Sequence, residues 1–156
     1  MRKDMNWRMD GEFLLIIHPL LRNKTVLRLK TIVHHKVTNR LDHSIGVAYR
    51  SYKVAKRLGW NHEAVARAAL MHDLFLETRV EIATLMIGSF NHAHPRIALN
   101  NANALCKLTD REEDIILSHM FLCSLKSPLP RFKESWLVTL VDKWCAIGER
   151  TRLITY

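Results

Sequence analysis

The chain has 156 residues, of which 48% are hydrophobic and 25% are charged, and a formal net charge of +9. This length and composition predict one globular domain that buries about two-thirds of its unfolded surface in a single core. The apolar run at residues 13–17 is far shorter than the ~18–20 residues that cross a bilayer, which excludes a spanning helix, and its flanks lack a signal-peptide cleavage site.

The basic balance, with a sequence pI of about 9.8, favours anionic partners, namely phosphorylated metabolites, nucleotides or nucleic acid. The three cysteines are odd in number and have no paired CxxC spacing, so we expect Cys106, Cys123 and Cys145 to be reduced, packed thiols. This cysteine usage predicts a cytoplasmic protein.

Apolar periodicity predicts helices along most of the chain. We expect a loose segment at residues 1–10, helices at 12–23 and 24–33 with a break near Pro19, and a polar turn that ends at Asn39. The clearest helix covers residues 41–58, where apolar residues recur at steps of four and three. Gly59 follows at the position expected of a C-terminal glycine.

Asn61 is predicted to cap the next helix, to about residue 75, before a shorter helix at 77–87 and a loop at 88–93. Pro95 is typical of a first helical turn and predicts a helix to about residue 108. Thr109 or Asp110 caps a helix to about 122, an extended loop covers 124–132, and a long helix covers 133–150. The predicted fold class is all-α.

Several of these helices carry a polar residue on an apolar face. In the sequence AALMHDLF, His72 and Asp73 each lie four residues after an alanine of the same face. His119 and Asp142 lie on apolar faces in the same way, His94 precedes Pro95, and His43 borders an apolar face. Buried imidazoles and carboxylates need partners, which a hydrogen-bond network or a divalent metal ion can supply.

The order of His43, His72-Asp73 and Asp142, within RLDHSIGVA, ALMHDLFL and LVDKWCA, resembles the HD-domain superfamily of metal-dependent phosphohydrolases. His94 and His119, within AHPRIAL and IILSHM, resemble its HDIG-type branch. Leu74-Phe75 replaces the Ile-Gly of that motif, Met120 replaces a second histidine, and the GYP signature of cyclic-di-GMP phosphodiesterases is absent. The resemblance covers roughly residues 37–147.

The resemblance implies a single-domain helical bundle with a core at residues 37–150, an N-terminal helical extension at 1–36 in the same domain, and a tail at 151–156. It implies one or two divalent ions, with Fe, Mn, Mg, Co, Ni and Zn not distinguished by the sequence. The implied ligands are His43, His72, Asp73 and Asp142, and a second ion bridged by Asp73 would add His94 and His119.

The implied reaction is hydrolysis of a phosphomonoester or phosphodiester, nucleotides included, by a metal-activated water. The expected catalytic residues are Asp73, with Arg40 and Lys143 as phosphate-binding cations. Weaker candidates are His35 and Ser44 at the pocket rim and Glu77 as an orienting group. The remaining histidines are assigned structural or surface positions: His18, His34, His62 and His92.

Two other functions stay open at this point. One is a di-iron oxygenase with the same order of ligands. The other is a basic helical module that binds nucleic acid around a structural metal. A phosphorylated small molecule or nucleotide is the favoured partner, nucleic acid is less favoured, no membrane partner is expected, and the sequence does not indicate an oligomeric state.

Overall fold

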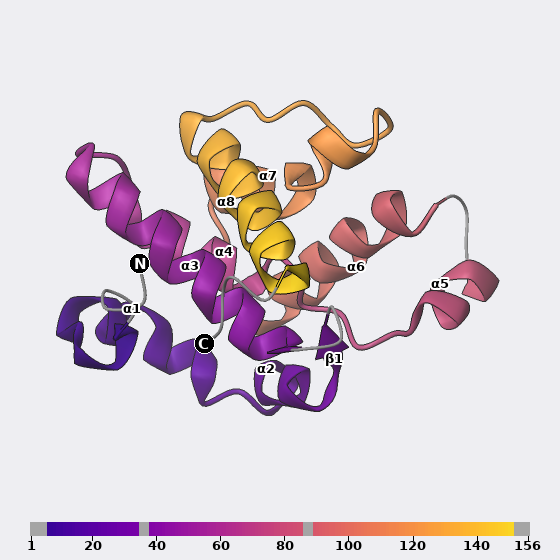
Figure 1. Ribbon diagram of the computed structural model, residues 1–156, viewed down its shortest axis with the longest axis horizontal. Helices are drawn as coiled ribbons and strands as arrows, with labels where there is room; N and C mark the ends of the chain where they lie inside the picture. Colours follow the sequence, from indigo (N-terminus) through magenta and orange to yellow (C-terminus); the bar gives the residue numbers. More distant parts are fainter. Residues whose placement is uncertain (1–5, 35–37, 86–88, 152–156) are drawn as a thin grey trace.

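The computed structural model describes residues 6–34, 38–85 and 89–151, and most of these residues are helical (Figure 1). The helices are α1 (Gly11–Leu21), α2 (Lys24–Arg28), α3 (Arg40–Arg57), α4 (His62–Met71), α5 (Arg79–Leu85), α6 (Phe90–Leu105), α7 (Asp110–Ser118) and α8 (Lys133–Arg150). Two strands of two residues each, β1 (Val33–His34) and β2 (Thr38–Asn39), precede α3 in the chain and pair antiparallel. The all-α prediction is confirmed.

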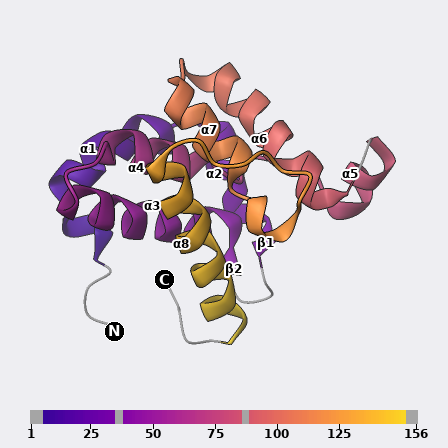
Figure 2. The ribbon, with the colours of Figure 1, turned by 90° about the horizontal axis from the view of Figure 1, so that it is seen from above.

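The central element is α3, which packs against α4 on one side and α8 on another (Figures 1 and 2). It begins where predicted because the Asn39 side chain accepts a hydrogen bond from the backbone N–H of Asp42 at 2.9 Å. Its end is also as predicted, since Gly59 follows with φ = 65°, in the left-handed region that glycine favours.

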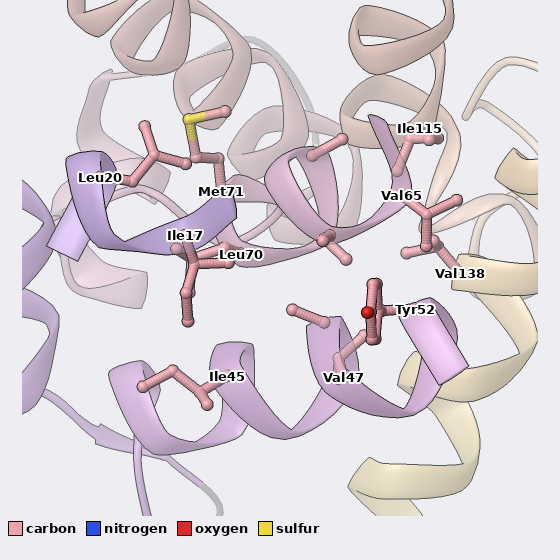
Figure 3. Packing of buried hydrophobic residues seen from close by; sticks show 14 of the residues in the cluster. Ile17, Leu20, Ile45, Val47, Tyr52, Val65, Leu70, Met71, Ile115 and Val138 are labelled. Carbon is pink, nitrogen blue, oxygen red and sulfur yellow. The ribbon is translucent and has the colours of Figure 1, made fainter. Parts of the chain in front are cut away.

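One hydrophobic core joins the helices. Figure 3 shows Ile17 of α1, Leu70 of α4, Tyr52 of α3 and Val138 of α8 pointing into the same interior, and all four are fully buried. The N-terminal helix α1 therefore shares its core with the helices that carry the polar residues on apolar faces. Among the described helices, none is long and apolar enough to cross a membrane.

Several predicted boundaries are wrong. Helix α1 continues through Pro19, which is exposed in its last turn, to Leu21. The proline has no N–H to donate to the carbonyl of Leu15, but this loss does not end the helix. Helix α6 begins at Phe90, so Pro95 lies in its second turn rather than its first. The predicted helix at 24–33 is shorter, since α2 is followed by a 3-10 turn (Leu29–Thr31) and then by β1.

Two further helices end earlier than predicted. Helix α4 ends at Met71 instead of continuing to about residue 75, and α7 ends at Ser118, before a short 3-10 turn (Phe121–Cys123). The long helix at 133–150 and the extended loop before it match the prediction. Parts of the predicted N-terminal segment (1–5), polar turn (35–37), helix and loop at 86–88, and tail (152–156) lie outside the described residues.

The three cysteines differ in how far they are buried. Cys145 is buried and Cys106 is half-buried, which agrees with packing inside the fold. Cys123 is exposed, so the prediction that it is packed is wrong.

Leu70→Ala tests the core beneath the polar cluster. Leu70 is fully buried two residues before His72, so the truncation should lower the free energy of unfolding by about 3 kcal/mol through lost burial and a residual cavity. Urea denaturation measures the change. Leu15→Ala, at a position 80% exposed on α1, is the matched control and should change stability by less than about 0.5 kcal/mol. Equal losses in both variants would contradict the packing described.

Candidate metal centre

The His72-Asp73 pair lies directly after the end of α4, where the chain turns. The Nδ1–H of His72 donates to the carbonyl of Ala69 at 2.7 Å, which directs the other ring nitrogen, Nε2, into the interior. That Nε2 lies 3.5 Å from an oxygen of Asp142 and 3.7 Å from Oδ2 of Asp73. His72 is fully buried and the two carboxylates are nearly so.

His94 of α6 and His119, which follows α7, face each other across Asp73. Each donates its Nδ1–H to a backbone carbonyl of its own segment, Phe90 for His94 and Ile116 for His119, both at 2.7 Å. Their Nε2 atoms lie 3.1 Å apart and 3.4 and 3.5 Å from Oδ1 of Asp73. A ring with its proton on Nδ1 has only a lone pair at Nε2, so three acceptors converge here.

His43 of α3 is held from both sides of its ring. Its Nδ1 lies 2.7 Å from Oε1 of Glu149, and its Nε2 lies 3.0 Å from Oδ1 of Asp142. Glu149 is fully buried and also accepts a hydrogen bond from the Thr38 hydroxyl at 3.3 Å. A carboxylate on one ring nitrogen commonly orients a histidine so that its other nitrogen can bind a metal.

The structure thus brings together all six residues that the sequence singled out as ligands. Among the described residues, three groups of three have ligand atoms that all lie within 4.8 Å of one another. They are His43 with His72 and Asp142, His72 with Asp73 and His119, and His34 with His43 and Asp73. Within the described residues, the buried atoms His72 Nε2 and Asp73 Oδ1 have no hydrogen-bond partner. Burial lowers the pKa of His72, but the carboxylates of Asp73 and Asp142 outweigh it and raise the pKa. Buried polar atoms without a partner are costly, and a proton or a divalent cation at Nε2 of His72 satisfies them.

The electrostatics of the two carboxylates reflect their surroundings. Burial raises the pKa of Asp73, but His72, His119 and His94 outweigh it and hold the pKa well below its usual value. Burial likewise raises the pKa of Asp142, and Lys143 and the nearby imidazoles more than reverse this. Both side chains are therefore ionised, as metal ligands must be.

The two outer histidines shift in opposite directions. Burial and the neighbouring imidazoles lower the pKa of His119 to about 4, against the pull of Asp73. Burial also lowers the pKa of His43, but its hydrogen bonds to Asp142 and Glu149 outweigh this effect and raise the pKa to about 10. His119 is thus held neutral and ready to accept, whereas His43 of the metal-free protein is protonated.

The cluster forms the floor of an open cavity of about 1140 Å³. Asp73, His94, His119 and Asp142 all contribute to its lining. Part of the wall comes from β1, from the segment between α4 and α5, and from one side of α8. The volume is that of a site for a small-molecule substrate.

Arg40 lies in the wall of this cavity. Its guanidinium stacks on the Phe75 ring, 3.6 Å from the ring centroid, and donates to the Phe75 carbonyl. Its buried Nε has no hydrogen-bond partner among the described residues. Burial lowers the pKa of Arg40, against the attraction of Asp73 and Glu77. The side chain is a fixed cation in the cavity wall.

Lys143 also lines the cavity, next to the metal-ligand candidates. Its ammonium donates to Oδ2 of Asp142 and lies 3.0 Å from the sulfur of Met120. Burial lowers the pKa of Lys143, and the carboxylate of Asp142 more than compensates and raises it. Met120 occupies the position where the HDIG-type branch has a second histidine. Here its side chain packs on the ammonium of Lys143.

Two residues of the site were not predicted from the sequence. His34, assigned a structural position, lies in β1 with its ring 4.1 Å from that of His43 and lines the cavity. Glu149 lies seven residues after Asp142, two helical turns along the same face, and this spacing was a signal for it. His34 has no such signal, because only the pairing of β1 with β2 brings it over α3.

The other predicted candidates are placed as follows. Ser44 is buried but does not line the cavity, and Glu77 lines it while accepting a hydrogen bond from the backbone of Leu76 at 2.9 Å. His35 lies outside the described residues. The remaining histidines lie away from the cluster: His18 is exposed, His62 pairs with Glu12, and His92 contacts the carbonyl of Lys126.

The raised pKa of His43 predicts a pH dependence of the metal-free protein. A group whose pKa rises from 6.5 to about 10 on folding stabilises the fold below pH 6.5, and this contribution is lost as the pH rises through about 10. We expect chelator-treated protein to lose on the order of 3 kcal/mol across this range. Urea denaturation as a function of pH measures it, and His43→Gln should remove that part of the slope. An unchanged slope in the variant would contradict the assignment.

Comparison with known proteins gives one match. The family model described as HD domain matches residues 40–147, a segment that contains the six clustered residues and Arg40. Neither the curated proteins nor the solved structures include a match. Members of this family are mostly metal-dependent hydrolases that act on phosphorylated substrates. Since the match covers more than half of the chain, the protein belongs to the HD domain family.

Proposed function

We propose that this protein is a metal-dependent phosphohydrolase that cleaves a phosphomonoester or phosphodiester, nucleotides included. The observation that carries the proposal is the convergence of buried acceptor atoms at Asp73, on the floor of a cavity whose wall holds Arg40 and Lys143. A cation is needed to hold such acceptors together, and the cations in the wall suit an anionic substrate.

The two oxygens of Asp73 point to two adjacent positions for metal ions. Oδ2 is directed toward His72, on the side of Asp142 and His43, whereas Oδ1 is directed toward His94 and His119. In the proposed centre, His43, His72, Asp73 and Asp142 hold one ion. Asp73, His94 and His119 hold a second, so that Asp73 bridges them.

When bound, the metal supplies a water of lowered pKa as nucleophile and neutralises phosphoryl oxygens. The protein residues set up this chemistry. Glu149 holds the Nδ1 proton of His43, which keeps Nε2 available as a ligand. The backbone carbonyls at Ala69, Phe90 and Ile116 do the same for the other three imidazoles.

The two cations in the cavity wall, Arg40 and Lys143, have different proposed roles. Arg40 is fixed by its stacking on Phe75 and lines the cavity, so its positive charge can attract a phosphoryl oxygen. Lys143 balances the charge of Asp142 and stands at the cavity surface, where it can also contact the substrate. Both act on charge that grows in the transition state.

The proposal is tested first by metal analysis of the purified protein and then by a screen for hydrolysis of phosphomonoesters and phosphodiesters, with Mn²⁺ or Co²⁺ added. A phosphatase coupled to the diester assay makes both reactions release phosphate. Oxygen consumption by an iron-loaded sample is measured in parallel. Phosphate release without oxygen uptake supports the proposal. Oxygen uptake without phosphate release would assign the centre to oxygenase chemistry instead.

Asp73→Ala should abolish turnover and remove the bound metal, because it deletes the carboxylate that bridges the two ions in the proposed centre. Circular dichroism should show retained helices, since the core lies beneath the site. His18→Ala, at an exposed position on α1, is the matched control and should keep metal and activity. Full metal stoichiometry in Asp73→Ala would sink the ligand assignment.

Arg40→Met should leave the metal content unchanged and reduce kcat/KM for a phosphorylated substrate by about 10- to 100-fold, because it removes a positive charge from the phosphate site. Steady-state kinetics and metal analysis measure the two effects. Arg28→Met, on the exposed face of α2 and outside the cavity, is the control. Unchanged kinetics in Arg40→Met would remove Arg40 from the substrate site.

A further inference from the structure

The outer face of α8 is apolar where a solvent-facing helix normally carries charge. The exposed residues of α8 are Lys133, Trp136, Leu140, Trp144, Ile147 and Arg150. Both glutamates of the helix, Glu134 and Glu149, are buried on its inner side. In Figure 1, α8 crosses the front of the molecule, and in the view of Figure 2 it forms one border.

Four of these residues make a continuous stripe, which we call the α8 stripe: Trp136, Leu140, Trp144 and Ile147. They follow one another at steps of four, four and three residues, so they lie on one face. Their exposed fractions are 36, 55, 45 and 62%. Single exposed apolar residues are ordinary on a surface, whereas a contiguous set that includes two tryptophans is typical of an interaction site.

We propose that a second copy of this chain covers the α8 stripe in a two-fold symmetric dimer. The stripe is self-complementary when two α8 helices run antiparallel about a point between Leu140 and Trp144. Leu140 then meets the partner subunit's Trp144, and Trp136 meets the partner subunit's Ile147. A two-fold interface needs this kind of pairing, in which one patch contacts its own copy.

The area of the α8 stripe limits the strength of such a contact. Large apolar side chains have on the order of 150–250 Å² of surface, so the exposed fractions leave roughly 400 Å² on each copy. Two copies bury roughly 800 Å² through the stripe alone. This total lies below the ~1,200 Å² of small stable interfaces, so the expected dimer is weak and exchanges with the monomer.

The charges around the α8 stripe place a condition on the dimer. The antiparallel pairing puts Lys133 at the solvated rim, near the partner subunit's Arg150. The guanidinium of Arg50 lies 5.4 Å from the centroid of the Trp144 ring, near the centre of the contact. Each copy carries a net charge of +9, so the copies repel each other at low ionic strength. Salt screens this repulsion and leaves apolar burial intact, so association should strengthen as salt is added.

The α8 stripe also adjoins the substrate cavity, since Ile147 belongs to both. The pairing therefore brings the partner subunit's Trp136 to the rim of the cavity. The dimer itself rests on the surface of α8 and does not depend on the chemistry proposed for the metal centre.

Sedimentation velocity of the full chain at micromolar concentrations, from about 0.05 to 0.5 M salt, tests the proposal. We expect a monomer–dimer equilibrium that shifts toward the dimer as salt rises. Leu140→Glu and, separately, Trp144→Glu should weaken the dimer at least 100-fold. Each variant places one carboxylate from each copy in the centre of the contact, where burial of charge is costly. Leu15→Glu, the same change at an exposed position on α1, should dimerise like the wild type.

Circular dichroism and metal content should be unchanged in all three variants, which separates loss of pairing from loss of folding. A wild-type chain that is monomeric across this range would overturn the proposal. Binding of the monomer to anionic lipid vesicles or to an acidic peptide would then assign the α8 stripe to a different partner. A dimer that persists in both stripe variants, or that dissociates as salt is added, would also overturn it.

Discussion

The structure depends on how charge is buried at Asp73. A carboxylate and several imidazoles inside a helical core are costly unless each polar atom has a partner. Here the protein satisfies only one nitrogen of His72, His94 and His119, through carbonyls of their own segments. The Nε2 atoms of His94 and His119 meet Oδ1 of Asp73 as acceptors. A cation would complete this interior, and a bound metal ion would then add to the stability of the fold.

Each helix contributes only one or two residues to the cluster, so the packing of the helices sets its geometry. His43 comes from the first turn of α3, His72 and Asp73 from the end of α4, and Asp142 from the middle of α8. Because α3 packs against both α4 and α8, a metal ion at this point ties together the elements that build the core. The same crossing leaves an open cavity on one side, whose wall supplies Arg40.

Helix α8 connects the two proposals. Its inner side presents Asp142 and Glu149 to the cluster, and Lys143 and Ile147 reach the cavity. Its outer side carries the α8 stripe. The opposite faces of one 18-residue helix thus carry a candidate metal ligand and, as proposed, the surface that pairs two copies. The basic charge of the chain attracts an anionic substrate to the cavity and makes two copies repel each other. Added salt screens both effects, so it should weaken substrate binding and strengthen pairing.

The sequence by itself determined the helical fold, and it placed His72, Asp73, His119 and Asp142 on apolar helix faces, because helical periodicity reveals such positions without any tertiary information. The resemblance to the HD-domain superfamily joined His43 and His94 to this set. It also contained a signal for Glu149, two turns after Asp142. Only the tertiary structure decided that His34 lies over His43, since a two-residue strand pairing has no periodic pattern. The tertiary structure also decided that Nε2 of His94 and of His119 meet at Oδ1 of Asp73. Distances between helices depend on packing and not on spacing along the chain.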